Sequence, residues 1–252
     1  KVVAGPEKKS AVVTDRDRKI TAYHEAGHAI VSRFVPLSDP VQMITIVPRG
    51  RAGGFTAYTQ DEDSQYMTVN AMKSRLAMML GGRSAELIIF EDFTTGASND
   101  IERATKLARS MVTTYGMSSK IGPINYDMGE EETFLGRDFG KGRSYSEDIA
   151  KLIDGEVKDL LDEAYATAQR VLSENVEFLH IIAKRLLEVE TISGKEFETM
   201  YKKYMGIEEE KEEVVEETVA EKKDSIDEIS STVETTEETK EEATDVEKTE
   251  TE

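Results

Sequence analysis

The sequence predicts a mainly helical domain with a small β element after its first helix, followed by a disordered acidic tail. Three observations lead to this prediction. Apolar residues recur with helical spacing over most of the first 206 residues. One stretch, residues 41–48, instead alternates and is rich in β-branched side chains. After residue 206 the chain is rich in Glu and Thr and has no aromatic residue. Such a segment is expected to be disordered, because it buries too little apolar surface to offset the entropy of ordering.

The first half of the domain is expected to contain two helices and a hairpin. The sequence VQMITIVP (41–48) favours a strand that stops at its proline, and FTAYT (55–59) favours a second strand after the loop RGRAGG. Helical spacing precedes and follows this hairpin. The expected elements are a helix over 15–36, strands over 41–48 and 55–59, and a helix over 67–89.

The second half is expected to be helical on both sides of an irregular segment. Asn99 and Glu102 have the spacing of a capping box. A helix is therefore expected to begin at Asn99 and to run to about Tyr115, where Gly116 ends it. The glycine-rich residues 117–143 show no regular spacing. The remaining expected elements are helices over about 145–173, 175–189 and 194–204.

Composition excludes several classes of site. The chain has no cysteine, which excludes disulfides and thiolate-bound metal. No apolar run approaches the roughly 20 residues that a membrane span needs. Residues 207–252 hold 20 acidic and 5 basic residues, so the tail accounts for most of the net charge of −19. The rest of the chain is only mildly acidic, and we expect no nucleic-acid partner.

Two of the three histidines lie four residues apart in TAYHEAGHAIV (21–31). On a helix, His24 and His28 share one face and can direct both imidazoles at one ion. Glu25 lies about 100° around the helix, where it can reach a water bound to that ion. The pattern H-E-x-x-H is therefore interpreted as a zinc protease site. In this interpretation His24 and His28 bind Zn²⁺ and Glu25 is the general base.

The same pattern can also arise by chance, in a helix whose histidines only pack. Gly27 favours a more specific role for this helix. A glycine in a helix interior costs about 1 kcal/mol relative to alanine, and close approach of another backbone is the expected compensation. The third histidine, His180, lies among apolar residues. We interpret it as a packed or half-buried residue and not as a metal ligand.

Two carboxylates compete for the third ligand position that a catalytic zinc usually has. Glu86 lies in the next helix, where one large group of zinc proteases has its third ligand. Asp100 lies in the first turn of a later helix, where the helix dipole favours an acidic residue in any case. Spacing alone leaves both possibilities open.

Seven motifs, taken in order, resemble the peptidase domain of the FtsH family of ATP-dependent, membrane-anchored zinc metalloproteases. They are KVVAGPEKKS, TAYHEAGHAIV, TIVPRG, LGGRSAE, FTTGASNDIERAT, YGMS and FLGR. The resemblance implies a helical FtsH-type peptidase domain over 11–206, preceded by the end of an ATPase module over 1–10. It does not extend to the acidic tail, 207–252. It implies that Asp100, and not Glu86, is the third zinc ligand. Glu86 is then expected to orient a histidine by accepting its ring N–H.

The resemblance also implies a function. It is the zinc-dependent hydrolysis of peptide bonds in unfolded or damaged proteins, within an ATP-dependent protease. A homohexamer is implied, as is attachment to the cytoplasmic face of the inner membrane through segments outside this sequence. No GxxxxGK[ST] phosphate loop occurs here, so we expect this chain to cleave unfolded polypeptide without hydrolysing ATP. The alternatives are a non-catalytic oligomerisation or adaptor module with a structural metal, and a hydrolase of small amides.

A substrate site is expected beside the zinc helix. Proteases of this kind commonly hold a substrate as an added strand at a sheet edge. The segment GGFTAY (53–58) can supply that edge, with Gly54, Phe55 and Thr56 as substrate-binding residues. The alternative is that this segment is only half of a hairpin that packs on the core.

Overall fold

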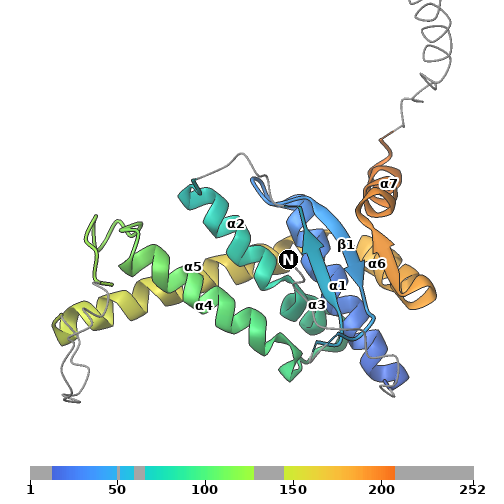
Figure 1. Cartoon of the computed structure of the whole chain (residues 1–252), viewed down its shortest axis with the longest axis horizontal. Coiled ribbons are helices and arrows are strands. Elements are labelled where there is room, and N and C mark those ends of the chain that lie inside the picture. The colour runs from blue at the N-terminus through green and yellow to red at the C-terminus, as the bar shows by residue number, and fades with distance from the viewer. Residues whose placement is uncertain (1–12, 50–51, 60–65, 128–144, 208–252) are drawn as a thin grey trace, which may run out of the picture. The chain divides into compact units, whose positions relative to one another are not determined.

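The structure, a computed structural model, describes residues 13–49, 52–59, 66–127 and 145–207. The chain divides into two units, Lys1–Gly206 and Ile207–Glu252, and the described elements belong to the first. That unit is mainly helical with one small sheet (Figure 1), which confirms the predicted fold class. The expected module end (1–10), the FLGR motif (134–137) and the tail from 208 onward lie outside the described residues.

Helix α1 (Asp15–Phe34) carries the H-E-x-x-H pattern and is closely as predicted. Thr14 caps its first turn, because its hydroxyl accepts a hydrogen bond from the backbone N–H of Asp17 at 3.1 Å. The helix ends before Pro36, which disfavours a helical conformation for the residue preceding it. The second half of α1, from Ala22 to Ser32, is buried on all sides. His24, Glu25 and His28 are therefore surrounded by other helices and strands.

The sheet has three short antiparallel strands in the order β2-β1-β3. They are β1 (Val41–Thr45), β2 (Phe55–Tyr58) and β3 (Thr191–Ser193). The hairpin of β1 and β2 is confirmed. β3 was not predicted, because three residues are too few to show alternation. It adds to β1 from the far end of the domain, which leaves β2 at one edge of the sheet among the described residues.

The prediction of one helix over 67–89 is wrong. The segment forms α2 (Val69–Met79) and α3 (Gly81–Phe90), which meet at Leu80. Apolar spacing continues through the junction, so the periodicity did not reveal it. The break occurs where α3 turns against α1. A β-carbon on Gly81 would lie only 2.8 Å from the backbone oxygen of Gly27.

Glycines allow α1 and α3 to lie in backbone contact. A β-carbon on Gly27 would lie 2.6 Å from the Gly81 oxygen and 2.6 Å from the Ala85 β-carbon. This confirms the close approach expected from a mid-helix glycine. One position further along α3, a β-carbon on Gly82 would lie 2.5 Å from the ring of His24. The glycine pair of α3 therefore makes room for both the helix and its imidazole.

Helix α4 (Ser98–Thr113) follows a short 3₁₀ turn over Thr95–Ala97. The predicted capping box is not formed: Ala97 is the capping residue, and no side chain caps this terminus. The 3₁₀ turn precedes the helix directly and takes the place of a side-chain cap. Gly116 has a positive φ of 61° beyond the C-terminus of α4, as expected for a helix-ending glycine.

The remaining helices enclose the core. They are α5 (Glu147–Glu174), α6 (Val176–Val189) and α7 (Gly194–Met205), close to their predicted ranges. α5 packs along α2, α3 and α4, and α6 packs against α1 (Figure 1). The largest fully buried side chains include Ile30, Met111, Ile153, Phe178 and Leu186. None of the helices that the structure describes is long and apolar enough to cross a membrane.

Candidate metal centre

Three side chains from two distant segments converge beside α1. The Nε2 atoms of His24 and His28 lie 3.1 Å apart. Asp100 Oδ2 from the first turn of α4 lies 3.3 Å from His24 Nε2 and 3.5 Å from His28 Nε2. Within the described ranges, no other group of three His, Asp or Glu side chains could hold a metal ion. The fold therefore brings Asp100, and not Glu86, to the facing ring nitrogens.

The other nitrogen of each ring is fixed by a hydrogen bond. His28 Nδ1 lies 2.8 Å from the backbone oxygen of Met78. A carbonyl oxygen only accepts, so the proton is on Nδ1 and Nε2 has a free lone pair. His24 Nδ1 lies 2.7 Å from Glu86 Oε1, and this carboxylate fixes the same tautomer. Both Nε2 lone pairs therefore point toward the space that Asp100 faces.

This arrangement fits a bound zinc ion. With both imidazoles neutral, two lone pairs and a carboxylate would face one another with no proton between them, so a cation is needed there. Tetrahedral zinc with bonds of about 2.0–2.1 Å places its ligand atoms about 3.3 Å apart. The observed separations of 3.1 to 3.5 Å match this value. Two imidazole nitrogens and one carboxylate are also a ligand set that zinc accepts.

In the metal-free protein, a proton on His24 supplies the positive charge. Burial alone would lower the pKa of His24, but its hydrogen bonds to Asp100 and Glu86 raise it to about 10. Burial alone would raise the pKa of Asp100. The hydrogen bond and the positive charge of protonated His24 outweigh burial and hold the pKa of Asp100 well below its usual range. The centre thus favours one cation between its three side chains.

Glu25 lies next to the centre without belonging to the converging group. Its side chain is buried, and its Oε2 accepts a hydrogen bond from the Thr56 hydroxyl at 2.8 Å. Burial raises the pKa of Glu25, while the charges of His28 and His24 and the Thr56 hydrogen bond act in the opposite direction. A raised carboxylate pKa is the usual property of a general base that works near neutral pH.

Glu86 connects the centre to the loop before α4. Its Oε1 binds His24, and its Oε2 accepts a hydrogen bond from the backbone N–H of Thr94 at 2.5 Å. Burial would raise the pKa of Glu86, but these two hydrogen bonds lower it. One buried carboxylate therefore orients a candidate ligand and ties down the segment that leads to Asp100. Sequence reasoning missed Thr94 and Met78, because both act through backbone atoms.

The interpretation of His180 as packed or half-buried is wrong. Its side chain is exposed on α6, and its Nδ1 lies 2.9 Å from the hydroxyl of Tyr23. The two rings also meet edge to face. Phe178, Leu179 and Ile182 turn to the core on another face of the helix, whereas Ile181 is exposed like His180. His180 does not belong to the converging group.

The three expected substrate-binding residues lie at the start of the edge strand. Phe55 pairs with Thr45 and Thr56 pairs with Ile44, so one side of this segment forms a hairpin with β1. The side chain of Thr56 is turned to Glu25. Gly54 precedes the strand, and a β-carbon there would lie 3.1 Å from Glu25 Cγ. Their role in binding a substrate stays a prediction.

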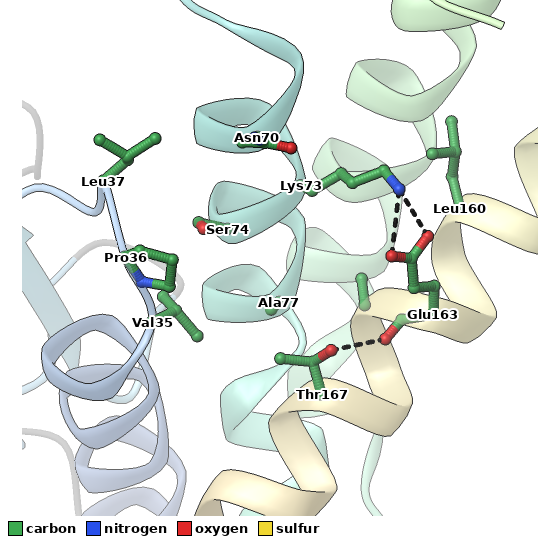
Figure 2. A pocket seen from close by; sticks show the side chains of 11 residues that line it. Val35, Pro36, Leu37, Asn70, Lys73, Ser74, Ala77, Leu160, Glu163 and Thr167 are labelled. Atoms are coloured by element: carbon green, nitrogen blue, oxygen red, sulfur yellow. Dashed lines mark hydrogen bonds and ion pairs between the residues drawn. The ribbon is translucent and has the colours of Figure 1, made fainter. Parts of the chain in front are cut away.

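A separate hollow of about 300 Å³ lies between α2, α5 and the turn after α1 (Figure 2). Lys73 of α2 and Glu163 of α5 form an ion pair across one side of it, with 2.8 Å between Nζ and Oε2. Its lining includes Val35, Leu37 and Leu160 but neither the histidines nor Asp100. The hollow is therefore distinct from the candidate metal centre.

The sequence of this chain is similar to a family of known peptidases. Residues 11–200 match the model of peptidase family M41. The chain belongs to peptidase family M41. This M41 domain is 49% identical over 201 residues to "ATP-dependent zinc metalloprotease FtsH 1" of Thermoanaerobacter sp. (strain X514), covering 80% of this chain and 33% of that protein. It is 50% identical over 197 residues to "ATP-dependent zinc metalloprotease FtsH" of Caldicellulosiruptor bescii, covering 78% of this chain and 32% of that protein.

The M41 match confirms the resemblance that the seven motifs indicated. The chain spans about a third of the length of these relatives. The matched range contains the H-E-x-x-H helix, Glu86 and Asp100. The converging side chains therefore lie in the part of the chain that defines its family.

Proposed function

We propose that this M41 chain is the zinc-dependent endopeptidase domain of a larger ATP-dependent protease. His24, His28 and Asp100 hold the zinc ion, and Glu25 is the general base. The observation that carries the proposal is the convergence of three electron-pair donors beside a buried carboxylate. The dependence on zinc and on ATP is inferred from the names of the relatives.

The bound zinc would lower the pKa of its water to about 7 and polarise the carbonyl of the substrate. The chain's own residues divide the remaining tasks. Glu25 accepts a proton from the attacking water and then donates it to the amine of the leaving peptide. Thr56 holds Oε2 of that carboxylate, which leaves Oε1 for proton transfer. Glu86 and the Met78 carbonyl keep the two imidazoles in the required orientation.

The proposed substrates are unfolded or damaged polypeptides. An extended segment adds to the edge of β2 beside Gly54, Phe55 and Thr56, and main-chain hydrogen bonds hold it with little demand on its sequence. The open edge of β2 among the described residues supports this mode. It also favours polypeptide over small amides, which need a closed pocket.

The remaining proposals concern the whole protein. We assign residues 11–206 to the peptidase domain, 1–10 to the end of an ATPase module and 207–252 to an acidic tail. A homohexamer is proposed from the family. From the family we also propose that the whole protein is attached to the cytoplasmic face of the inner membrane.

Replacing Glu25 by Gln tests the proposed function. The amide keeps the size of the side chain but cannot accept the proton. We expect the purified variant to keep its zinc, measured by elemental analysis, while cleavage of unfolded casein falls by at least about 10²–10⁴-fold. Wild-type cleavage by Glu25→Gln would remove Glu25 from the mechanism.

The alternative, an oligomerisation or adaptor module with a structural metal, has less support. Structural zinc sites are closed by four protein ligands. The described part of the chain offers three converging side chains, which leaves a position for water. Zinc-loaded protein that is inert toward unfolded casein would favour the alternative.

A further inference from the structure

The hydroxyl of Thr56 is aimed at the candidate general base. Its Oγ1 lies 2.8 Å from Glu25 Oε2 and 3.2 Å from the backbone oxygen of the same residue. The hydroxyl therefore contacts both the main chain of α1 and the carboxylate of Glu25. Glu25 is only 7% exposed, so water offers few competing hydrogen bonds to this oxygen. A hydrogen bond to a buried carboxylate is among the stronger ones in proteins.

The position of Thr56 is fixed by the sheet and by a close contact at Gly54. Pairing of Thr56 with Ile44 sets the register of β2. Side chains alternate along a strand, so this register decides that the hydroxyl faces α1. At Gly54, a β-carbon would lie 2.8 Å from Thr21 Cγ2 and 2.5 Å from the Thr45 oxygen. The absence of a side chain at Gly54 lets the start of β2 lie directly on the zinc helix.

We propose that Thr56 is a positioning residue, which holds the Glu25 carboxylate in the orientation needed for proton transfer. The inference rests on the proposed role of Glu25 as general base. Without the hydroxyl, the carboxylate is free to rotate and loses a fixed partner for Oε2. Proton transfer requires the base to be within hydrogen-bond reach of the attacking water, so a rotated carboxylate slows the reaction.

The same contact links substrate binding to the base. Thr56 lies in the strand to which the substrate is proposed to add, so its backbone belongs to the substrate edge while its side chain belongs to the catalytic machinery. A substrate strand on β2 restrains the backbone of Thr56, and through the hydroxyl it restrains Glu25. An extended polypeptide thereby improves the alignment of the base that takes a proton from the attacking water.

The test compares Thr56→Val with Thr56→Ser in the full chain. Valine keeps the shape and β-propensity of threonine but removes the hydroxyl, whereas serine keeps the hydroxyl. We expect Thr56→Val to lower kcat for casein cleavage roughly 10- to 100-fold, with KM changed less than about twofold because the strand backbone is intact. Thr56→Ser is expected to stay within about threefold of wild type. Zinc content and thermal unfolding should be unchanged in both.

Thr45→Val serves as a matched control, and Glu25→Gln separates failure of this inference from failure of the proposed function. Thr45 is the control, because its hydroxyl binds Thr191 and the Glu190 carbonyl on the other side of the sheet. Folded Thr45→Val is expected to keep the wild-type kcat. Suppose that Glu25→Gln is inactive, as the proposed function requires. A wild-type kcat in Thr56→Val, or a change in its KM alone, would then overturn the positioning role. Activity in Glu25→Gln would instead overturn the proposed function. Loss of zinc in both Thr56 variants would mean that Thr56 is structural.

Discussion

At the scale of single residues, the centre depends on hydrogen bonds that the sequence pattern does not contain. The spacing of His24, Glu25 and His28 predicted two imidazoles on one helical face with a carboxylate beside them, and the structure has this geometry. The choice between Glu86 and Asp100 could not be made from spacing. It depends on how the loop before α4 folds back, and the hydrogen bond from the Thr94 N–H to Glu86 ties that loop to α3. The motif resemblance, and not the residue pattern, favoured Asp100.

The different contacts of the two carboxylates predict different effects on zinc binding. Asp100→Asn removes the negative charge that faces both Nε2 atoms, so zinc affinity is expected to fall by more than about 100-fold. Glu86→Gln keeps an acceptor for His24 Nδ1 but weakens it, so a loss of about 10-fold is expected, at the low end for residues that orient a ligand. Competition with a chromogenic chelator measures both variants. A larger loss in Glu86→Gln than in Asp100→Asn would contradict the ligand assignment.

The raised pKa of His24 predicts that zinc and a proton compete. His24 is protonated in the metal-free protein below about pH 10, and only its deprotonated form binds metal. Apparent zinc affinity should therefore rise about tenfold per pH unit between about pH 7 and 9, and level off above the pKa of His24. Calorimetry in buffers of different ionisation enthalpy should detect about one proton released per zinc. Affinity that is constant over this range would contradict the prediction.

At the scale of elements, the crossing of α1 and α3 is the contact that shapes the site. The helical periodicity predicted both segments but not the break at Leu80, because apolar spacing continues through it. Gly27 did predict a close backbone contact, since its cost in a helix needs compensation. The partner in that contact, Gly81, could not be inferred because packing partners are not encoded locally. β3 was missed for a similar reason, as its only signal is its pairing with β1.

Alanine substitutions separate helix propensity from packing at these glycines. Gly27→Ala is expected to destabilise the domain by about 1–3 kcal/mol or more, because its β-carbon would collide with Ala85 and the Gly81 backbone. Gly155→Ala in the exposed part of α5 is the matched control, since a β-carbon there has no neighbour within 4 Å. It is expected to stabilise by up to about 1 kcal/mol through propensity alone. Urea unfolding measures both, and two changes of the same sign would contradict this account.

At the scale of the whole molecule, the sheet joins distant parts of the chain. β3 follows α6 near the end of the domain, and it pairs with β1, whose hairpin partner supports Glu25. The Thr45 and Thr191 hydroxyls lie 2.8 Å apart across this junction. The fold class and most helices follow from composition and periodicity. The pairing of strands about 150 residues apart could not be predicted in this way, because it depends on tertiary packing.

The edge-strand mode predicts which proteins this chain can cleave. A substrate must offer an extended backbone, and in a stably folded protein those groups are already paired. We expect the chain to cleave a destabilised, unfolded variant of a test protein while leaving the folded wild type of that protein intact. Gel electrophoresis over time measures both reactions. Equal rates for the two forms would contradict strand addition as the mode of binding.

The hydrogen bonds at Nδ1 of the two imidazoles have one more consequence. Met78 and Glu86 hold both rings through protein hydrogen bonds, and the helices around the centre are held together by a large apolar core. Chelation should therefore empty the centre and leave the domain folded, unlike a zinc finger, which unfolds when its metal is removed. Withdrawal and return of the ion would then act as a reversible off-switch for this protein.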